Sequence, residues 1–317
     1  MDFDSAAARQ GGVVTHEQAI ELGVSESEIR SNLRNRRWRR IHRGTYLTFG
    51  GPIPRASLIW AAVLAVGDDA AASHSTAGEL WGICAPEVGP IHIAVPLAHG
   101  RSRTFSGVTV HRMTRWESAV HPTVVPPMTR VDETVLDMIQ VARCEDDVIS
   151  VLSQACGRGL TTPSRLRDTA YDRPRLRWRL VVYDALRDIQ DGVRSPLESR
   201  YRRHVELARG LPTGFRQAPA RDLDGGRIYR DVRYAEFRTI VELDGRAVHP
   251  IEDRSRHLRR DNSAATAGEV VLHFGWSDVA ERPCETAAAV ALAVRAGGWT
   301  GRLKRCKQGC RVSDRMR

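Results

Sequence analysis

Four side chains in the stretch YRDVRYAEFRTIVELDGRAVH, residues 229–249, are of the types that bind metal ions or transfer protons: Asp231, Glu242, Asp244 and His249. Two short runs rich in β-branched residues flank a turn here, which is the pattern of a β-hairpin. A purely structural hairpin has little need of three carboxylates and a histidine. Carboxylate oxygens are ligands that Mg²⁺ and Mn²⁺ prefer. The stretch therefore predicts a divalent-metal site.

The register of this hairpin decides whether the carboxylates meet. Side chains alternate along a strand, so Glu242 and Asp244 share one face. A two-residue turn at Ala235 and Glu236 would place Asp231 on the same face, diagonal to Glu242 at roughly 7–8 Å. A loop one residue longer would place them on opposite faces. The geometry of the two carboxylates therefore depends on the length of the loop.

A metal held by Asp231 and Glu242 could orient and acidify a water and neutralise charge that develops at a phosphorus. Glu198, on the preceding predicted helix, is a candidate third carboxylate that acts through a water. Histidine titrates near neutral pH, so His249, just after the glycine turn that follows Asp244, suits a general acid or base. These residues could therefore form a metal site that cuts DNA, or they could decorate a purely structural pair of strands.

The elements around the hairpin predict one compact domain over residues 193–300. In SPLESRYRRHVELARG, Ser195 is a helix cap, Pro196 occupies the first helical position and Glu198 lies in the first turn. After the hairpin, EDRSRHLRRDNSAATAG predicts a helix, EVVLHFGW a buried strand and ERPCETAAAVALAVRAGG a closing helix. The expected order is helix–strand–strand–strand–helix–strand–helix, an α/β domain.

These motifs resemble the PD-(D/E)XK nuclease superfamily, and most closely its branch related to the very-short-patch mismatch-repair endonucleases. The resemblance extends over roughly residues 193–296 and includes the downstream segments R-x₃-RDN and VVLHFGWSDV. It implies a restriction-endonuclease-like fold. It also implies Asp231 and Glu242 as metal ligands, Glu198 as an accessory acid and His249 as a site residue.

One position departs from the general signature of that superfamily. Asp244 stands where the signature has a lysine, and the only lysines of the chain are Lys304 and Lys307. An active enzyme would then use His249, an arginine or a second metal in that role, and the short-patch branch tends to use histidine. The alternative is a degenerate nuclease fold that binds DNA or a partner without cutting.

Positive charge is concentrated in two stretches. Residues 30–43 hold seven arginines and no acidic residue, and residues 301–317 hold seven basic residues and one aspartate. Together they exceed the net charge of +10, so the rest of the chain is slightly acidic. Such patches are typical of phosphate contact. The predicted DNA contacts are Arg30, Arg34, Arg37, Arg39, Arg40 and Arg43.

The first basic stretch follows two consecutive capping boxes, Thr15 with Gln18 and Ser25 with Glu28. The short glycine-containing linker between them and the segment WRRIHRGTYLTFG, read as a small β-wing, predict a winged helix-turn-helix over residues 8–50. The second helix would enter the major groove, and the wing would contact phosphates. The alternative is a solvated basic helix face.

The rest of the chain divides into three predicted segments. Residues 51–165 alternate helical and strand patterns, which predicts a mixed α/β domain, and residues 166–192 predict a helical connector. His74, His92 and His111 lie on different predicted elements of the mixed domain, so we expect ordinary histidines rather than a shared site. The basic tail, 301–317, is expected to be disordered.

The N-terminal segments GGVVTHEQAIELGVSESEIRSNLRNRRWRRIHRGTYLTFG and ASHSTAGELWGI resemble the AbiEi-type antitoxins of abortive-infection, type IV toxin–antitoxin systems. The resemblance extends over about residues 8–160. It implies a DNA-binding autoregulator with a winged helix, an α/β domain and a cognate toxin or another defence-system partner. The segment PPMTRVDETVLDMIQVA matches the family pattern only in part, which leaves the role of the middle domain open.

Two functions remain after this reading. The first is a cytoplasmic DNA-binding protein with a Mg²⁺- or Mn²⁺-dependent endonuclease domain, acting in phage defence or DNA repair. The alternative is a non-catalytic regulator or antitoxin that keeps the nuclease fold for interaction. The sequence has no apolar run long enough for a membrane span and no secretory signal. It also has no phosphate-binding loop or dinucleotide fingerprint.

Overall fold

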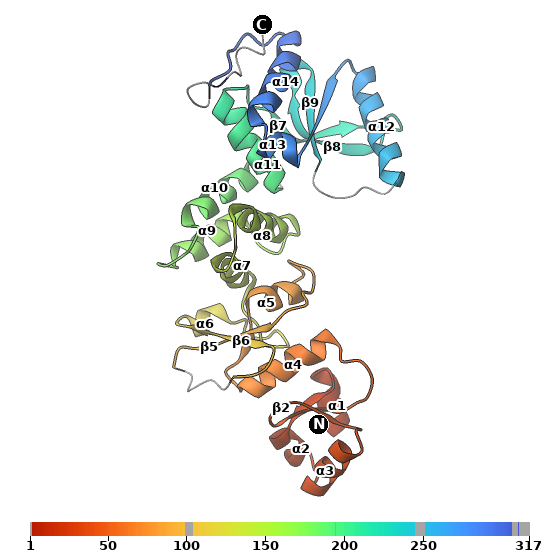
Figure 1. The fold of residues 1–317 in the computed structure, drawn as a ribbon, viewed down its shortest axis with the longest axis vertical. Coiled ribbons are helices and arrows are strands. Elements are labelled where there is room, and N and C mark those ends of the chain that lie inside the picture. Colours follow the sequence, from red (N-terminus) through yellow and green to blue (C-terminus); the bar gives the residue numbers. More distant parts are fainter. Residues whose placement is uncertain (1, 99–103, 194, 245–250, 306–309, 311–317) are drawn as a thin grey trace. The chain divides into compact units, whose positions relative to one another are not determined.

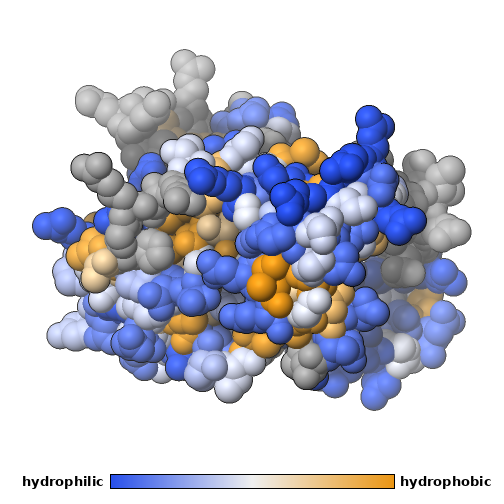
Figure 2. Space-filling view, turned by 90° about the horizontal axis from the view of Figure 1, so that it is seen from below, coloured by the Kyte–Doolittle hydropathy of each residue, from blue (hydrophilic) through white to orange (hydrophobic). Residues whose placement is uncertain are grey.

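The computed structural model describes residues 2–98, 104–193, 195–244, 251–305 and 310, with the backbone alone for 251–257. The fold is mixed α/β, as predicted (Figure 1). It divides into two compact units, Met1–Asp147 with Gln154–Arg179, and Val148–Ser153 with Leu180–Arg317. Within the described ranges, no helix is both long and apolar enough to cross a membrane. On the face drawn in Figure 2, hydrophilic residues predominate and hydrophobic residues form small separate patches.

The N-terminal part of the first unit packs short helices on a small antiparallel sheet with strand order β1-β3-β2. Both predicted capping boxes are confirmed. The side-chain oxygens of Thr15 and Ser25 each accept the backbone N–H three residues on, and their own backbone N–H groups donate to the side chains of Gln18 and Glu28. Ile29 and Trp38 are buried in its core. The elements are α1 (Phe3–Arg9), β1 (Val13–Thr15), α2 (His16–Glu21), α3 (Glu26–Arg34), β2 (Arg39–His42) and β3 (Thr45–Leu47).

The remainder of the first unit contains a second three-stranded sheet, with strand order β4-β5-β6 and β5 parallel to β6. Ile93 and Val95 of β5 are fully buried against Ile59 of α4. The elements are α4 (Arg55–Val66), β4 (Ala71–Ala72), α5 (His74–Leu80), β5 (Ile91–Pro96), β6 (Val108–Met113), α6 (Trp116–Ala119), α7 (Val131–Gln140), α8 (Glu145–Gly157, shared with the second unit) and α9 (Pro163–Tyr171).

The second unit is built on a four-stranded sheet with strand order β10-β9-β8-β7. β7, β8 and β9 are antiparallel neighbours, and β10 runs parallel to β9. The predicted order of elements is confirmed, with two added short helices, η2 and α13. The elements are α10 (Arg179–Gln190), α11 (Pro196–Arg200), the π-helix η1 (Tyr201–Leu207), β7 (Phe215–Arg221), β8 (Arg227–Tyr234), the 3-10 helix η2 (Ala235–Phe237), β9 (Thr239–Asp244), α12 (Ile251–Thr266), β10 (Val270–Gly275), α13 (Trp276–Ala280) and α14 (Pro283–Ala296).

The two faces of this sheet have different partners. One face presents Val232, Val241 and Leu243 to α11, η1, α13 and α14, and these side chains form the core of the unit. Each fully buried side chain of this kind contributes about 1.5–3 kcal/mol to folding. Helix α12 covers the other face (Figure 1). On this second face Arg230 donates to Oγ of Ser263, and Arg260 donates to Glu242, so charged residues of β8 and β9 contact α12.

Part of the predicted disordered tail contacts this unit. Leu303 packs against the core, and the backbone N–H of Lys304 donates to the carbonyl oxygen of Arg209 at 2.7 Å. The other residues of the predicted tail, apart from 301–305 and Cys310, lie outside the described part of the chain.

Candidate functional site

The register of β8 and β9 places Asp231 and Glu242 next to each other. Val232 is opposite Val241, and the loop that joins the strands holds four residues, 235–238. The predicted two-residue turn is therefore wrong. The longer loop moves the pairing by two positions, and since side chains repeat every two positions, the faces are unchanged. Asp231 and Glu242, the next residues after the last pair of this ladder, contact each other, since the backbone N–H of Asp231 lies 3.4 Å from Oε2 of Glu242.

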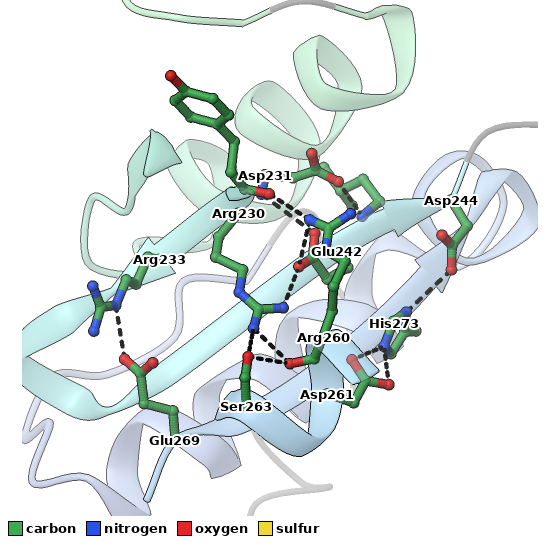
Figure 3. Close-up of polar contacts among 12 residues, drawn as sticks. Arg230, Asp231, Arg233, Glu242, Asp244, Arg260, Asp261, Ser263, Glu269 and His273 are labelled. Atoms are coloured by element: carbon green, nitrogen blue, oxygen red, sulfur yellow. Dashed lines mark hydrogen bonds and ion pairs between the residues drawn. The ribbon is translucent and has the colours of Figure 1, made fainter. Parts of the chain in front are cut away.

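Backbone groups fix the two carboxylates where the ladder between the strands ends (Figure 3). The Asp231 carboxylate accepts the N–H of Leu243 at 2.8 Å and the side-chain amide of Gln217 at 3.4 Å. The backbone N–H of Asp231 donates to Oε2 of Glu242 at 3.4 Å. The carboxylate of Asp231 therefore replaces a backbone acceptor at this point, which holds it beside Glu242.

The pKa of Asp231 reflects this surrounding. Burial raises the pKa to about 6, and the nearby carboxylate of Glu242 adds to the rise. The N–H of Leu243 and the guanidinium of Arg260 oppose it. Two carboxylates in a shared buried site repel each other, and a cation between them would remove that repulsion.

Two arginines neutralise Glu242. Arg230 is 1% exposed, and its guanidinium donates to Oε1 of Glu242 at 2.9 Å, to the carbonyl of Arg260 at 2.7 Å and to Oγ of Ser263 at 3.1 Å. Arg260 of α12 approaches the same carboxylate oxygen at 3.4 Å (Figure 3). A metal would therefore compete with a buried guanidinium for Glu242. Arg260 belongs to the RDN segment named in the sequence analysis, but the sequence did not indicate its contact with Glu242.

Asp244 takes part in a second contact group on the same face. His273 of β10 is paired in register with Glu242, and its Nδ1 lies 3.2 Å from Asp244. Its Nε2 lies 3.1 Å from Asp261 of α12 (Figure 3). Burial lowers the pKa of His273, but the carboxylates of Asp261 and Asp244 outweigh it and hold the pKa above its ordinary value. The sequence motifs contained His273 and Asp261, but nothing local indicated that they meet Asp244.

The Asp231 carboxylate borders a cavity of about 680 Å³. Three arginines and two further carboxylates line it, so its walls are strongly polar. The ring of Tyr229 is 42% exposed, and the guanidinium of Arg227 lies 5.2 Å from its centroid. The lining residues are Gln217, Asp222, Asp224, Arg227, Ile228, Tyr229, Asp231, Arg259 and Arg260.

The remaining predicted site residues are Glu198 and His249. Glu198 is 6% exposed in the first turn of α11, where its backbone N–H donates to Oγ of Ser195 as predicted. The adjacent Leu197 packs into the core on the face of the sheet opposite α12. His249 lies outside the described residues. Roles for both at the site stay predictions.

The six predicted DNA-contacting arginines lie on α3 and the segment that follows it. Arg30 and Arg34 are exposed on α3, and Arg37, Arg40 and Arg43 are exposed on or beside the β2–β3 hairpin. Buried Trp38 anchors the chain between helix and hairpin. The half-buried Arg39 has two guanidinium nitrogens without hydrogen-bond partners among the described residues. The fold therefore leaves most of this charge open to solvent.

Three histidines of the first unit form a cluster that the sequence did not indicate. His74, His92 and His111 stack together, with ring centroids of His74 and His111 3.7 Å apart. Nδ1 of His92 and Nε2 of His111 are 2.9 Å apart. The parallel pairing of β5 and β6, with α5 beside them, brings the rings together. Burial lowers the pKa of His74 and of His111 to about 3, and the neighbouring rings add to this.

We expect the first unit to lose stability as the pH falls. Because the folded pKa of His74 lies below the ordinary 6.5, the unfolded chain binds more protons below that pH. As the pH falls from about 7 to 5, the unfolded chain takes up a proton at His74 and the folded chain does not. This difference alone should lower the free energy of unfolding by about 1 kcal/mol for each pH unit below the ordinary pKa. Thermal unfolding across this range measures the slope. His74→Gln should flatten it and His121→Gln should not; equal slopes in all three proteins would contradict the expectation.

Comparisons with protein-family models and with curated proteins find no match. The function of the chain must therefore be inferred from its own residues. Two groups are the strongest candidates: the arginines of α3 and the β2–β3 hairpin, and the carboxylates of β8 and β9 with the cavity beside them.

Proposed function

We propose that this is a DNA-binding protein whose second unit hydrolyses DNA phosphodiester bonds with Mg²⁺ or Mn²⁺, in phage defence or DNA repair. The observation that carries the proposal is the pair of adjacent carboxylates, Asp231 and Glu242, beside a cavity lined by arginines. The carboxylates would hold the metal, and the arginines would receive the phosphates of the strand.

The carboxylate pair suits a hard divalent cation. Asp231 and Glu242 offer oxygen ligands, and Mg²⁺ is commonly held by one or two carboxylates with water and phosphate oxygens. Burial raises the pKa of Asp231, the Glu242 carboxylate adds to the rise, and a bound cation would favour the charged form of both carboxylates. When bound, the metal would acidify the attacking water and stabilise charge on the phosphate. Within the described residues no group of three or more His, Cys, Asp or Glu is arranged to hold a metal, so water and phosphate would supply the remaining ligands.

The protein's own residues have separate roles in this proposal. Arg260, which lines the cavity, would bind a phosphate oxygen through its guanidinium. His273 would keep Asp244 and Asp261 in place through its two ring nitrogens. Asp231 and Glu242 would hold the cation, with Glu198 and His249 as the accessory acid and the proton-transfer group.

DNA binding would use a winged helix-turn-helix in the first unit. The order α2, short turn, α3 and β2–β3 hairpin is the order of that motif, and α3 carries exposed Arg30 and Arg34. In this arrangement α3 would enter the major groove. The arginines of the hairpin would contact phosphates, which positions the protein on DNA without reading its sequence.

A non-catalytic regulator or antitoxin, working with a cognate toxin or another defence-system partner, is the second candidate. The observation that favours it is the 2.9 Å ion pair between Glu242 and Arg230, whose side chain is almost completely buried. Removing one partner of a buried pair leaves an uncompensated charge, which costs several kcal/mol. A metal that draws Glu242 away from Arg230 would meet part of this cost.

Nicking of a supercoiled plasmid separates the two functions. The purified protein should convert the plasmid to nicked or linear forms with Mg²⁺ or Mn²⁺, and EDTA should stop the conversion. A gel-shift assay in EDTA, on a fragment of the same plasmid, reports DNA binding alone. Binding without cleavage under either metal would reject the nuclease and favour the regulator.

A further inference from the structure

The cavity beside Asp231 has the features of a site for a single nucleotide. It lies between the turn that joins β7 and β8 and the helix α12, and its volume is about 680 Å³. Small-ligand sites have volumes of about 300–1,000 Å³. Its walls combine three kinds of group. An aromatic ring can stack on a base, guanidinium groups can bind a phosphate, and carboxylates can accept hydrogen bonds from the polar edge of a base.

Tyr229 supplies the aromatic surface. Its side chain is 42% exposed although it lies on a strand, and Arg227 lies 5.2 Å from the ring centroid. Exposed aromatic rings and arginine planes are the platforms on which proteins stack nucleic-acid bases. Tyr229 belongs to the lining of the cavity and not to the hydrophobic core, and the guanidinium of Arg227 lies over its ring, so a base would stack on the ring or on the Arg227 plane.

The phosphate side of the cavity is formed by Arg259 and Arg260. Arg259 is exposed, whereas the guanidinium of Arg260 is tied to Glu242 and to the carbonyl of Tyr229. Arg260 therefore links the aromatic wall to the carboxylate pair. A phosphate held here would lie next to Asp231, the residue shared by the cavity and the proposed metal site.

The opposite rim is acidic and held in a fixed turn. Oδ1 of Asp222 accepts the backbone N–H groups of Asp224 and Gly226, at 3.1 and 2.6 Å. Carboxylates repel the phosphates of a strand but accept the amino groups on base edges. A strand is therefore favoured in one orientation, with its backbone toward α12 and its base toward the turn.

We propose that this cavity binds one unpaired nucleotide of a DNA strand, with its base on Tyr229 and its phosphate at Arg259 and Arg260. In a duplex the faces of a base are covered by its neighbours, so a base reaches the ring only where the strand is single or the base has left the stack. The inference rests on the proposed function, since it assigns the form of DNA that the same site accepts. It names single-stranded DNA, or an unpaired position in a duplex, as the substrate.

Fluorescence of 2-aminopurine tests this without any cleavage. A short DNA strand with 2-aminopurine at its centre is titrated with the full-length protein in EDTA, alone and annealed to its complement. Because the base stacks on Tyr229, binding should strongly quench the 2-aminopurine fluorescence of the single strand. The fluorescence of the duplex should change little. Tyr229→Phe should keep the quenching, and Tyr229→Leu should weaken the affinity obtained from the quenching curve at least about fivefold. Phe215→Leu, which removes another exposed aromatic ring of the same sheet, should have no effect.

The outcomes distinguish this inference from the nuclease. Equal quenching in Tyr229→Leu and the unaltered protein would overturn the site, as would equal quenching of single strand and duplex. Because the titration contains no metal, quenching that depends on Tyr229 supports the nucleotide site even where plasmid cleavage fails. Cleavage of the plasmid together with no effect of Tyr229→Leu would leave the nuclease standing and reject the site.

Discussion

Asp231→Asn should abolish metal-dependent cleavage and leave DNA binding almost unchanged. The substitution keeps the size of the side chain and its ability to accept the N–H of Leu243, but it removes the charge shared with Glu242. Losing several kcal/mol of metal-based stabilisation corresponds to a fall in the cleavage rate of about 100-fold or more. The rate of plasmid nicking with Mg²⁺ or Mn²⁺ measures it, and gel shift in EDTA measures binding.

Glu281→Gln is the matched control for this variant. Glu281 is exposed at the end of α13 and is not part of the cavity lining. The Glu281→Gln protein should cut DNA at close to the normal rate. A parallel loss of cleavage and DNA binding in Asp231→Asn, or an equal loss in Glu281→Gln, would show that the carboxylate pair is not the metal site.

Arg30→Ala with Arg34→Ala should weaken DNA binding and make it less sensitive to salt. Both side chains are exposed on α3, and Nε of Arg30 is only loosely held by the carbonyl of Glu26, at 3.2 Å. Each lost phosphate contact should reduce the slope of log K against log salt by about 0.9. We therefore expect a slope shallower by about two units and an affinity about tenfold lower at moderate salt. Fluorescence anisotropy on a labelled duplex at several salt concentrations measures both.

The control pair is Arg143→Ala with Arg175→Ala. It removes the same charge from other exposed positions of the first unit. Its salt slope should equal that of the unaltered protein. If the two double variants behave alike, the charge acts only through the net charge of the protein. If the Arg30 and Arg34 variant binds normally, the basic face of α3 is only a solvated surface.

Local patterns predicted much of the second unit. The cap at Ser195 and the strand TIVELD depend on residues within one turn or one strand, and both occur as predicted. The shared face of Asp231 and Glu242 also followed from the alternation of side chains, although the loop length was wrong. The prediction of a shared face was correct despite the wrong loop length, because the register changed by two positions and side chains alternate with a period of two.

The sequence did not predict what surrounds the carboxylates. Arg230 meets Glu242 across 12 residues, Arg260 meets it across 18, and His273 meets Asp244 across 29. Pairs at such separations depend on which strands are neighbours and on the face that α12 covers. Neither property is encoded in the spacing of a single segment.

The histidines of the first unit show the same limit. His92 and His111 became neighbours through the parallel pairing of β5 and β6, and α5 then placed His74 on them. The sequence by itself determined the helices, the strands, their caps, the basic stretch and the identity of the carboxylates, because these depend on short-range periodicity and charge. Only the tertiary structure decided that arginines neutralise Glu242, that a cavity opens beside Asp231 and that three histidines stack, because each requires segments distant in sequence to pack against one another.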